Sequence, residues 1–260
     1  APDARFPETR VNSSRLAASN GRETATAQQH TLGTNPKGQS MKNGTAMLLV
    51  TGVMTMGLDA AAERQREGTE WSIIYWFNAN QTKLPRILLV GDSICNGYQS
   101  SVKNELTDVA YTSFYATSKC VTDRSFIKEL THILDEYDYS VVHFNNGLHS
   151  LGTDRKEWES ALRDVVKTLR EKAKGAKLVF ATSTPLKKPD MTEKAKELNA
   201  IAKRVMEEEG IPINDLFALM DPQDRALWSD TYHYHAAGRE MQAKQVAEAI
   251  RKLLPSKPAE

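Results

Sequence analysis

Between residues 85 and 254, short apolar segments alternate with longer segments of helical periodicity, and this alternation constrains the fold more than any other feature of the sequence. Short runs rich in Val, Ile, Phe and Tyr are typical of β-strands, whereas apolar residues that recur every three or four positions are typical of amphipathic helices. On this basis we predict five strands, at residues 86–91, 110–116, 140–146, 177–183 and 211–214.

The segments between and after these strands predict amphipathic helices. Each has one apolar face, and the faces consist of Phe126, Leu130 and Ile133; Trp158, Leu162, Val165 and Leu169; Leu198, Ile201, Ala202 and Val205; and Ala243, Val246, Ile250 and Leu253. Gly175 and Gly210 stand where two of these helices should end. Strands that alternate with helices pair in parallel through right-handed crossovers, so the predicted fold is a three-layer α/β/α sandwich with a five-stranded parallel sheet.

The length, charge and hydropathy of the chain narrow its class. With 260 residues it can form one sizeable core and still carry an appendage. Its formal net charge of +1 gives no indication of a nucleic-acid partner. No apolar run approaches the ~18 residues that a transmembrane helix needs, so we expect a soluble globular protein without a membrane span.

The first forty residues differ in composition from the rest of the chain. They contain one aromatic residue, Phe6, and three larger aliphatic residues, Val11, Leu16 and Leu32, among polar residues, Gly and Pro. Such a segment buries too little apolar surface to offset the entropy that is lost on ordering. We therefore predict that residues 1–40 form a disordered extension.

Residues 41–63 have the outline of a secretory signal peptide. Lys42 follows Met41, about a dozen mostly apolar residues come next, and Ala60-Ala61-Ala62 has the character of a cleavage site. Signal peptides begin chains, so this interpretation requires Met41 to be the true start. The alternative is an ordinary buried strand or helix. The first interpretation predicts a secreted or periplasmic protein, and the second a cytoplasmic one.

In parallel α/β sheets, chemically active groups collect at the carboxyl ends of the strands. The first predicted strand ends at Gly91-Asp92-Ser93, and Asp230 and His233 lie just before the final helix. A carboxylate three residues before an imidazole can reach back and fix its tautomer. If the fold brings His233 to the end of the first strand, Ser93 gains a general base and becomes a nucleophile. Each motif alone is more often a turn or a helix cap, so the prediction depends on their order along the chain.

With its motifs in this order, the sequence resembles the SGNH or GDSL hydrolases. Their first block is a strand followed by Gly-Asp-Ser, and their last is Asp-x-x-His followed by a helix, which "DTYHYHAAG" matches. The resemblance covers about residues 84–254 and implies a flavodoxin-like, five-stranded sandwich in a domain at residues 70–255. It also implies that Ser93 is the nucleophile, His233 the base and Asp230 the acid that orients the base.

Two blocks depart from the family pattern. The second block of the family supplies an oxyanion-hole glycine after the second strand, and this chain has no glycine there. A backbone N–H near Cys120 is therefore expected to serve instead. The third block, Gly-x-Asn-Asp, is best matched by Gly147-Leu148-His149-Ser150. We accordingly expect His149, or one of the preceding Asn145 and Asn146, to donate a hydrogen bond to the oxyanion.

The resemblance implies a serine hydrolase that cleaves carboxylic esters through an acyl-enzyme. The family consists mostly of esterases, acyl-hydrolases and carbohydrate deacetylases, so the expected partner is a small-molecule or carbohydrate ester with a short acyl group, acetyl above all. The altered second and third blocks favour an alternative, a non-catalytic carbohydrate-binding or scaffold protein on a degenerate SGNH fold. No cofactor is expected.

Four histidines raise the question of a metal site: His143, His149, His233 and His235. His143 stands within an apolar strand, where a buried structural role is the more common one, and His235 is expected to cap the final helix or line the pocket. The spacing of the four matches no known metal-binding helix, so we expect no metal.

Two other groups of residues leave alternatives open. Cys95 and Cys120 follow adjacent predicted strands, and they either form a disulfide or remain free, buried thiols. Trp71, Tyr75 and Trp76 precede the first strand. They are expected to cover the edge of the sheet by packing, and stacking on a sugar is the alternative.

Overall fold

The computed structural model describes residues 66–255, so the predicted extension at 1–40 and the signal-like segment at 41–63 lie outside the described residues. The elements in chain order are β1 (Ser72–Trp76), β2 (Arg86–Gly91), α1 (Ser93–Glu105), β3 (Tyr111–Thr117), α2 (Phe126–Glu136), β4 (Val141–Phe144), the short 3₁₀ helix η1 (Leu148–Ser150), α3 (Arg155–Lys172), β5 (Lys177–Ala181), α4 (Pro189–Glu208), β6 (Ile213–Asn214), α5 (Leu216–Met220), the 3₁₀ helix η2 (Arg225–Leu227) and α6 (Ala236–Arg251).

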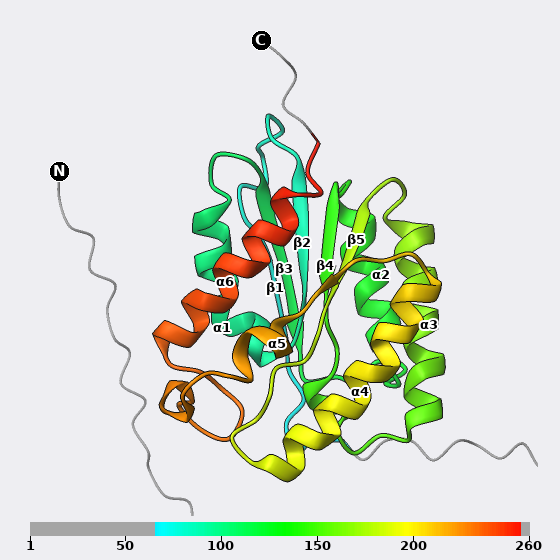
Figure 1. Cartoon of the computed structure of the whole chain (residues 1–260). Coiled ribbons are helices and arrows are strands. Elements are labelled where there is room, and N and C mark those ends of the chain that lie inside the picture. The colour runs from blue at the N-terminus through cyan, green and yellow to red at the C-terminus, as the bar shows by residue number, and fades with distance from the viewer. Residues whose placement is uncertain (1–65, 256–260) are drawn as a thin grey trace, which may run out of the picture. The chain divides into compact units, whose positions relative to one another are not determined.

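The strands form one sheet in the order β1-β3-β2-β4-β5-β6, with helices on both faces (Figure 1). Strands β2 to β6 are parallel to one another. Taken without β1, their order is that of the flavodoxin-like doubly wound fold, in which connections on the two sides of the first strand place helices on opposite faces. The predicted three-layer α/β/α sandwich is therefore confirmed.

The edge strand β1 corrects the predicted strand count from five to six. It runs antiparallel to β3, with Ser72 opposite Thr117 and Trp76 opposite Ser113. The aromatic residues around it do pack at this edge, because the Tyr75 ring stacks on Phe114 with the ring centroids 6.0 Å apart. The sequence pattern gave β1 no partner, since it pairs with a strand that is not its neighbour along the chain.

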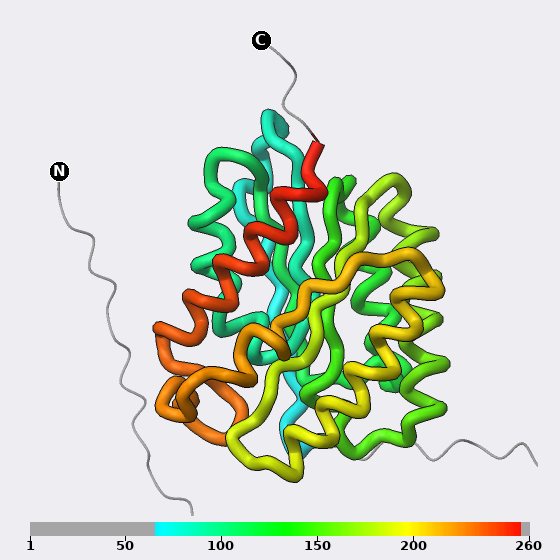
Figure 2. Tube along the Cα trace, viewed as in Figure 1, coloured from blue at the N-terminus to red at the C-terminus, as the bar shows by residue number. Residues whose placement is uncertain are grey.

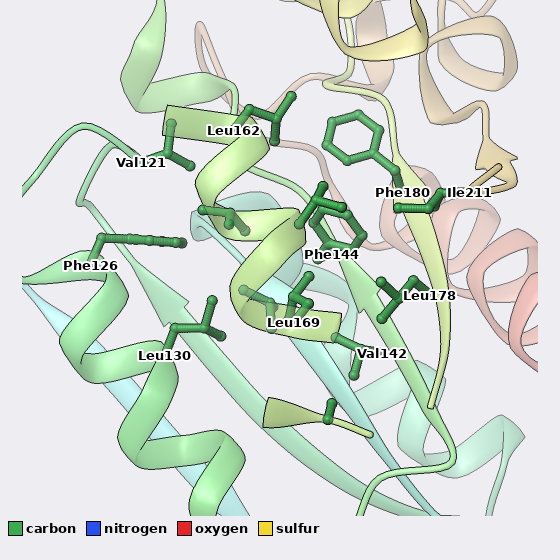
Figure 3. Close-up of a cluster of buried hydrophobic side chains, with 14 of the residues drawn as sticks. Val121, Phe126, Leu130, Val142, Phe144, Leu162, Leu169, Leu178, Phe180 and Ile211 are labelled. Atoms are coloured by element: carbon green, nitrogen blue, oxygen red, sulfur yellow. The ribbon is translucent and has the colours of Figure 1, made fainter. Parts of the chain in front are cut away.

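The side chains on the two faces of the central strand β2 belong to two separate hydrophobic clusters. Ile87 and Leu89 pack with α1 and α6, whereas Leu88 and Val90 pack with α2, α3 and α4. This two-residue alternation is that of a strand buried on both faces, which explains its uninterrupted apolar sequence. Figure 3 shows the second cluster, in which the labelled Phe144 and Phe180 meet edge to face at 5.3 Å between ring centroids.

Gly91, Gly175 and Gly210 lie at positions that a side chain would strain. Gly175 and Gly210 have φ angles of +82° and +64°, the left-handed conformation that ends the preceding helix, as the sequence predicted. At Gly91 an added Cβ would lie 2.5 Å from the Cβ of Cys95. Glycine therefore lets strand β2 turn directly into α1.

The two cysteines are free, buried thiols rather than a disulfide. They cannot meet because Cys95 packs in the cluster with α1 and α6, whereas Cys120 packs in the cluster on the opposite face of the sheet. In the described part of the chain, no helix has the length and apolar character needed to cross a membrane.

Candidate active site

The amino end of α1 stands at the carboxyl end of the central strand β2. Asp92 caps this helix, since its Oδ1 accepts a hydrogen bond from the N–H of Ile94 at 2.9 Å. Ser93 is the first helical residue. Its own N–H makes no hydrogen bond to any residue that the structure describes, as is usual in the first turn of a helix. This N–H is therefore available to a ligand that binds beside the Ser93 hydroxyl.

A tight loop between η2 and α6 brings the later motif to the same place. Trp228 and Tyr234 anchor the two ends of this loop, because both are buried and both donate side-chain hydrogen bonds to the carbonyl of Pro185, at 3.2 and 2.8 Å. The N–H of Ser229 donates to the carbonyl of His233 at 2.9 Å, which closes the loop. In Figure 2 this orange segment lies at the lower edge of the view, where the parallel strands end.

Ser93, His233 and Asp230 form one hydrogen-bonded chain, although Ser93 is 140 residues from His233 in sequence. The Nε2 of His233 lies 2.8 Å from the Oγ of Ser93, and its Nδ1 lies 2.8 Å from the Oδ2 of Asp230. The histidine and aspartate side chains are 40% and 52% exposed, so a substrate can reach the serine-histidine pair.

The charge state of Asp230 fixes how the protons of this chain are arranged. Partial desolvation acts against the charged form. The hydrogen bonds that Asp230 accepts from the N–H groups of His233 and Tyr232 and from the His233 ring outweigh this effect, and together they lower its pKa to about 2. An ionised carboxylate can only accept, so a neutral imidazole at this position donates from Nδ1. Its Nε2 is then an acceptor for the Ser93 hydroxyl.

The predicted oxyanion donors Cys120 and Asn146 already have partners within the protein. The N–H of Cys120 donates to the Oδ2 of Asp123 at 2.9 Å. Asn146 donates from Nδ2 to the carbonyl of Lys119 at 2.8 Å, and its Oδ1 accepts from the N–H of Val121 at 3.1 Å. The bonds of Asn146 tie the loop after β3 to the loop after β4, whereas the bond of Cys120 lies within the loop after β3.

The other two candidates in this block, Asn145 and His149, also have partners. Asn145 donates to the carbonyl of Ala181 at 2.7 Å and is buried. His149, on η1, lies with its Nδ1 2.5 Å from a carboxylate oxygen of Glu67, and its ring meets Trp71 edge to face. None of these contacts involves Ser93.

Two cavities flank Ser93. An open one of ≈ 340 Å³ lies on the His233 side, and its wall includes Ser93 and His235. The other is much smaller, ≈ 20 Å³, and its wall includes Asp92, Ile94, Leu148 and Tyr232. Since Asp92 and Ile94 are the chain neighbours of Ser93, and Tyr232 is the neighbour of His233, the small cavity adjoins the serine-histidine pair.

The described residues contain no group of three or more His, Cys, Asp or Glu side chains that could hold a metal ion. His143 is fully buried in β4, where its Nε2 accepts a hydrogen bond from the side-chain Nδ2 of Asn214 at 3.0 Å. Burial lowers the pKa of His143 to about 4, so the ring is neutral near pH 7. His235 is the N-cap residue of α6 and lines the open cavity.

Two residues that line the open cavity were not identified from the sequence, namely Arg239 and Gln242. They follow His235 by four and seven positions, and this spacing places all three on one face of α6. This helical spacing could be read from the sequence. However, only the packing of α6 against α1 shows that the face they share meets Ser93.

Three of the solved structures similar to this chain are named as esterases. An aryl esterase from Mycobacterium smegmatis superposes with a TM-score of 0.57 at 15% identity and covers 65% of this chain and 100% of its own. An acetyl xylan esterase gives 0.55 at 17%, with 64% and 99% covered. A carbohydrate acetylesterase family member from Sinorhizobium meliloti gives 0.55 at 13%, with 66% and 99% covered. At these identities the likeness establishes the fold.

A search of the curated proteins found no match to this chain. The family model described as GDSL-like Lipase/Acylhydrolase matches residues 89–241, which is more than half of the 260 residues. The matched range begins within β2, before Ser93, and ends within α6, after His233, so it contains both motifs. The chain belongs to the GDSL-like lipase/acylhydrolase family.

Proposed function

We propose that the chain hydrolyses short-acyl esters, acetyl esters of carbohydrates above all, with Ser93 as nucleophile, His233 as general base and Asp230 as the acid that orients it. The observation that carries this proposal is the 2.8 Å separation of His233 Nε2 and Ser93 Oγ. A hydroxyl at this distance from an imidazole acceptor can lose its proton as it attacks.

In the acylation half of the reaction, the Ser93 oxygen attacks the ester carbonyl carbon while its proton passes to Nε2 of His233. The ionised Asp230, bonded to Nδ1, stabilises the imidazolium that forms. The N–H of Ser93 at the amino end of α1 donates to the oxyanion, and the helix dipole adds to this stabilisation. The bond to the alcohol oxygen then breaks, and His233 returns the proton to the leaving alcohol.

In the deacylation half, water replaces the alcohol. His233 takes a proton from the water as its oxygen attacks the acyl carbon, and the bond to Ser93 Oγ breaks as the proton returns to the serine. The products are the free acid and the original enzyme, so the cycle needs no cofactor.

The small cavity beside Ser93 supports a short acyl group. Its ≈ 20 Å³ is room for about one water-sized or methyl-sized group. The wall is formed in part by Leu148, Leu151 and Leu186, which suit an apolar methyl. An acetyl group therefore fits, whereas each further methylene must displace part of this wall.

Support for a carbohydrate as the alcohol comes from the similar structures. One is named an acetyl xylan esterase and another a carbohydrate acetylesterase family member. The open cavity on the His233 side is large enough for a sugar ring and is lined by several polar side chains, among them Asn96 and Ser229.

The test is hydrolysis of p-nitrophenyl acetate and of acetylated methyl glycosides by the wild type and by Ser93→Ala. We expect hydrolysis by the wild type and none above background by the variant, with an unchanged circular dichroism spectrum. Labelling by a fluorophosphonate probe separates the enzyme from the non-catalytic binding protein, because only an activated serine reacts. A folded Ser93→Ala protein with wild-type rates contradicts the proposal.

A further inference from the structure

The open cavity beside Ser93 contains groups that ester hydrolysis by itself does not use. Its ≈ 340 Å³ falls in the range of small-molecule sites, ~300–1,000 Å³. The cavity borders His233, which in the proposed mechanism returns a proton to the leaving alcohol. On the basis of that proposed function, the alcohol portion of the ester lies in this cavity.

The cavity is formed where one face of α6 meets one face of α1. On α6, His235, Arg239 and Gln242 follow one another by successive turns, and on α1 Ser93 and Gly97 are one turn apart. A Cβ added at Gly97 would lie 3.1 Å from the Cδ of Arg239, so the arginine stem rests against bare α1 backbone. Residues one helical turn apart are ~5–6 Å apart, which places Arg239 within reach of a ligand bound at Ser93.

The charge in this cavity is positive. The Arg239 side chain is exposed, and its guanidinium makes no hydrogen bond or ion pair with any residue that the structure describes. The cavity wall includes no Asp or Glu. The nearby carboxylate of Asp230 is hydrogen-bonded to His233. The amino end of α6, which begins at Ala236, adds a partial positive charge to the same region.

We propose that this cavity binds a carboxylate carried by the alcohol portion of the substrate, so that the enzyme acts on acetyl esters of acidic sugars. The guanidinium of Arg239 provides a planar pair of donors that matches the two oxygens of a carboxylate. A neutral sugar leaves the charge of Arg239 unmatched and gains less from the cavity.

The first experiment compares two esters that differ in one group. These are the methyl glycosides of a mono-O-acetyl hexuronic acid and of the corresponding mono-O-acetyl hexose, neutral at C6. We expect the wild type to prefer the acid by about ten- to a hundred-fold in kcat/KM, mainly through a lower KM, because a charge-assisted pair is formed. The preference should shrink as the ionic strength rises.

Variants assign this preference to the residues of the cavity. Arg239→Gln keeps most of the stem against Gly97 and removes the charge, so the ratio of acid to neutral ester should fall to about one. The matched control is Lys244→Gln, which removes the same charge from an exposed position on α6 outside the cavity wall. It should keep the wild-type ratio.

Several results would overturn this inference. One is equal use of the two esters by the wild type, and another is a ratio that Arg239→Gln leaves unchanged. A third ester, the O-acetyl hexose sulfated at C6, tests the class of anion, and a preference for it over the uronic acid contradicts the assignment to carboxylates.

A binding measurement separates this inference from the proposed function. Isothermal titration of the Ser93→Ala protein with the deacetylated methyl hexuronide and with the methyl hexoside reports the cavity alone. If the wild type hydrolyses neither ester, the proposed function fails, and the titration still decides about the cavity. Tighter binding of the hexuronide supports the carboxylate site, and equal binding refutes it.

Discussion

Two polar regions lie at the carboxyl edge of the same sheet and use their hydrogen-bonding groups in opposite ways. In the corner formed by α1 and the loop before α6, Ser93 and His233 are accessible, and the Ser93 N–H has no partner among the described residues. In the paired loops after β3 and β4, Cys120 and Asn146 are buried and bonded to other parts of the protein.

The difference shows that position relative to the strands does not determine the use of a polar group. All these residues follow parallel strands or join them, where chemistry is expected. A donor can stabilise a developing charge only if it is not already satisfied by a rigid internal partner. We therefore propose that the corner at Ser93 is the reactive region and that the paired loops act as the scaffold that holds the neighbouring strand ends together.

The largest expected effect is that of Asp230→Asn in the reactive corner. The amide would donate to Nδ1 of His233 and so favour the wrong tautomer, and we expect kcat to fall by about three to four orders of magnitude. The measurement is steady-state hydrolysis of p-nitrophenyl acetate. Asp224→Asn is the control, since Asp224 precedes η2 in the same loop region and only caps it, through the N–H of Ala226. A kcat close to wild type in Asp230→Asn would remove the triad from the mechanism.

The next largest effect is that of Asn146→Ala, which distinguishes a structural role from a catalytic role for Asn146 in the paired loops. Asn146→Ala leaves the N–H of Val121 and the carbonyl of Lys119 without their partner, and we expect a loss of about 3 kcal/mol in the free energy of unfolding. An oxyanion donor would instead lower kcat by ~10²–10³ with little change in stability. Urea unfolding and ester kinetics on one preparation decide between the two. The exposed Asn104→Ala serves as the control and should change neither.

The buried His143 makes the stability of the folded protein depend on pH. The pKa of His143 is about 4 in the folded protein against 6.5 for the free side chain, because burial disfavours the charged ring. The unfolded chain therefore binds a proton at a pH where the folded one does not. Stability from this group is complete above pH ~6.5 and falls by about 3 kcal/mol as the pH drops to about 4.

The check on His143 is urea unfolding at several pH values in this window. His143→Gln can keep an acceptor for Asn214. The free energy of unfolding of this variant should change less steeply with pH than that of the wild type, and the difference in slope should correspond to the uptake of up to one proton on unfolding. His132→Gln, at an exposed position on α2, should retain the wild-type dependence. Identical pH profiles for His143→Gln and the wild type would show that His143 is not the group that titrates.

The smallest effect concerns the length of the acyl group. One methylene changes specificity by about 10- to 200-fold in an apolar pocket, so the wild type should hydrolyse p-nitrophenyl acetate well ahead of the butyrate. Leu148→Ala enlarges the small cavity, and we expect it to raise the ratio of butyrate to acetate turnover by about ten-fold. A ratio that does not change would place the acyl group elsewhere.

The sequence by itself determined the layers of the fold and predicted Ser93, Asp230 and His233 as the residues of the reactive corner. The apolar run before Ser93 and the helical faces on both sides specify a buried parallel sheet, because burial on both faces favours the apolar residues 87–90 in the middle of β2. Parallel strands place their carboxyl ends at one edge, which is why Ser93 could be connected with Asp230 and His233 from order alone.

Only the tertiary structure decided the remaining features. Strand β1 pairs with β3 far along the chain, and the partners of Asn146 come from another loop. The same is true of Arg239, whose place beside Gly97 depends on how α6 crosses α1. Hydrogen bonds and contacts between distant segments depend on packing, and a local pattern of residue types carries no information about which donor will find a partner.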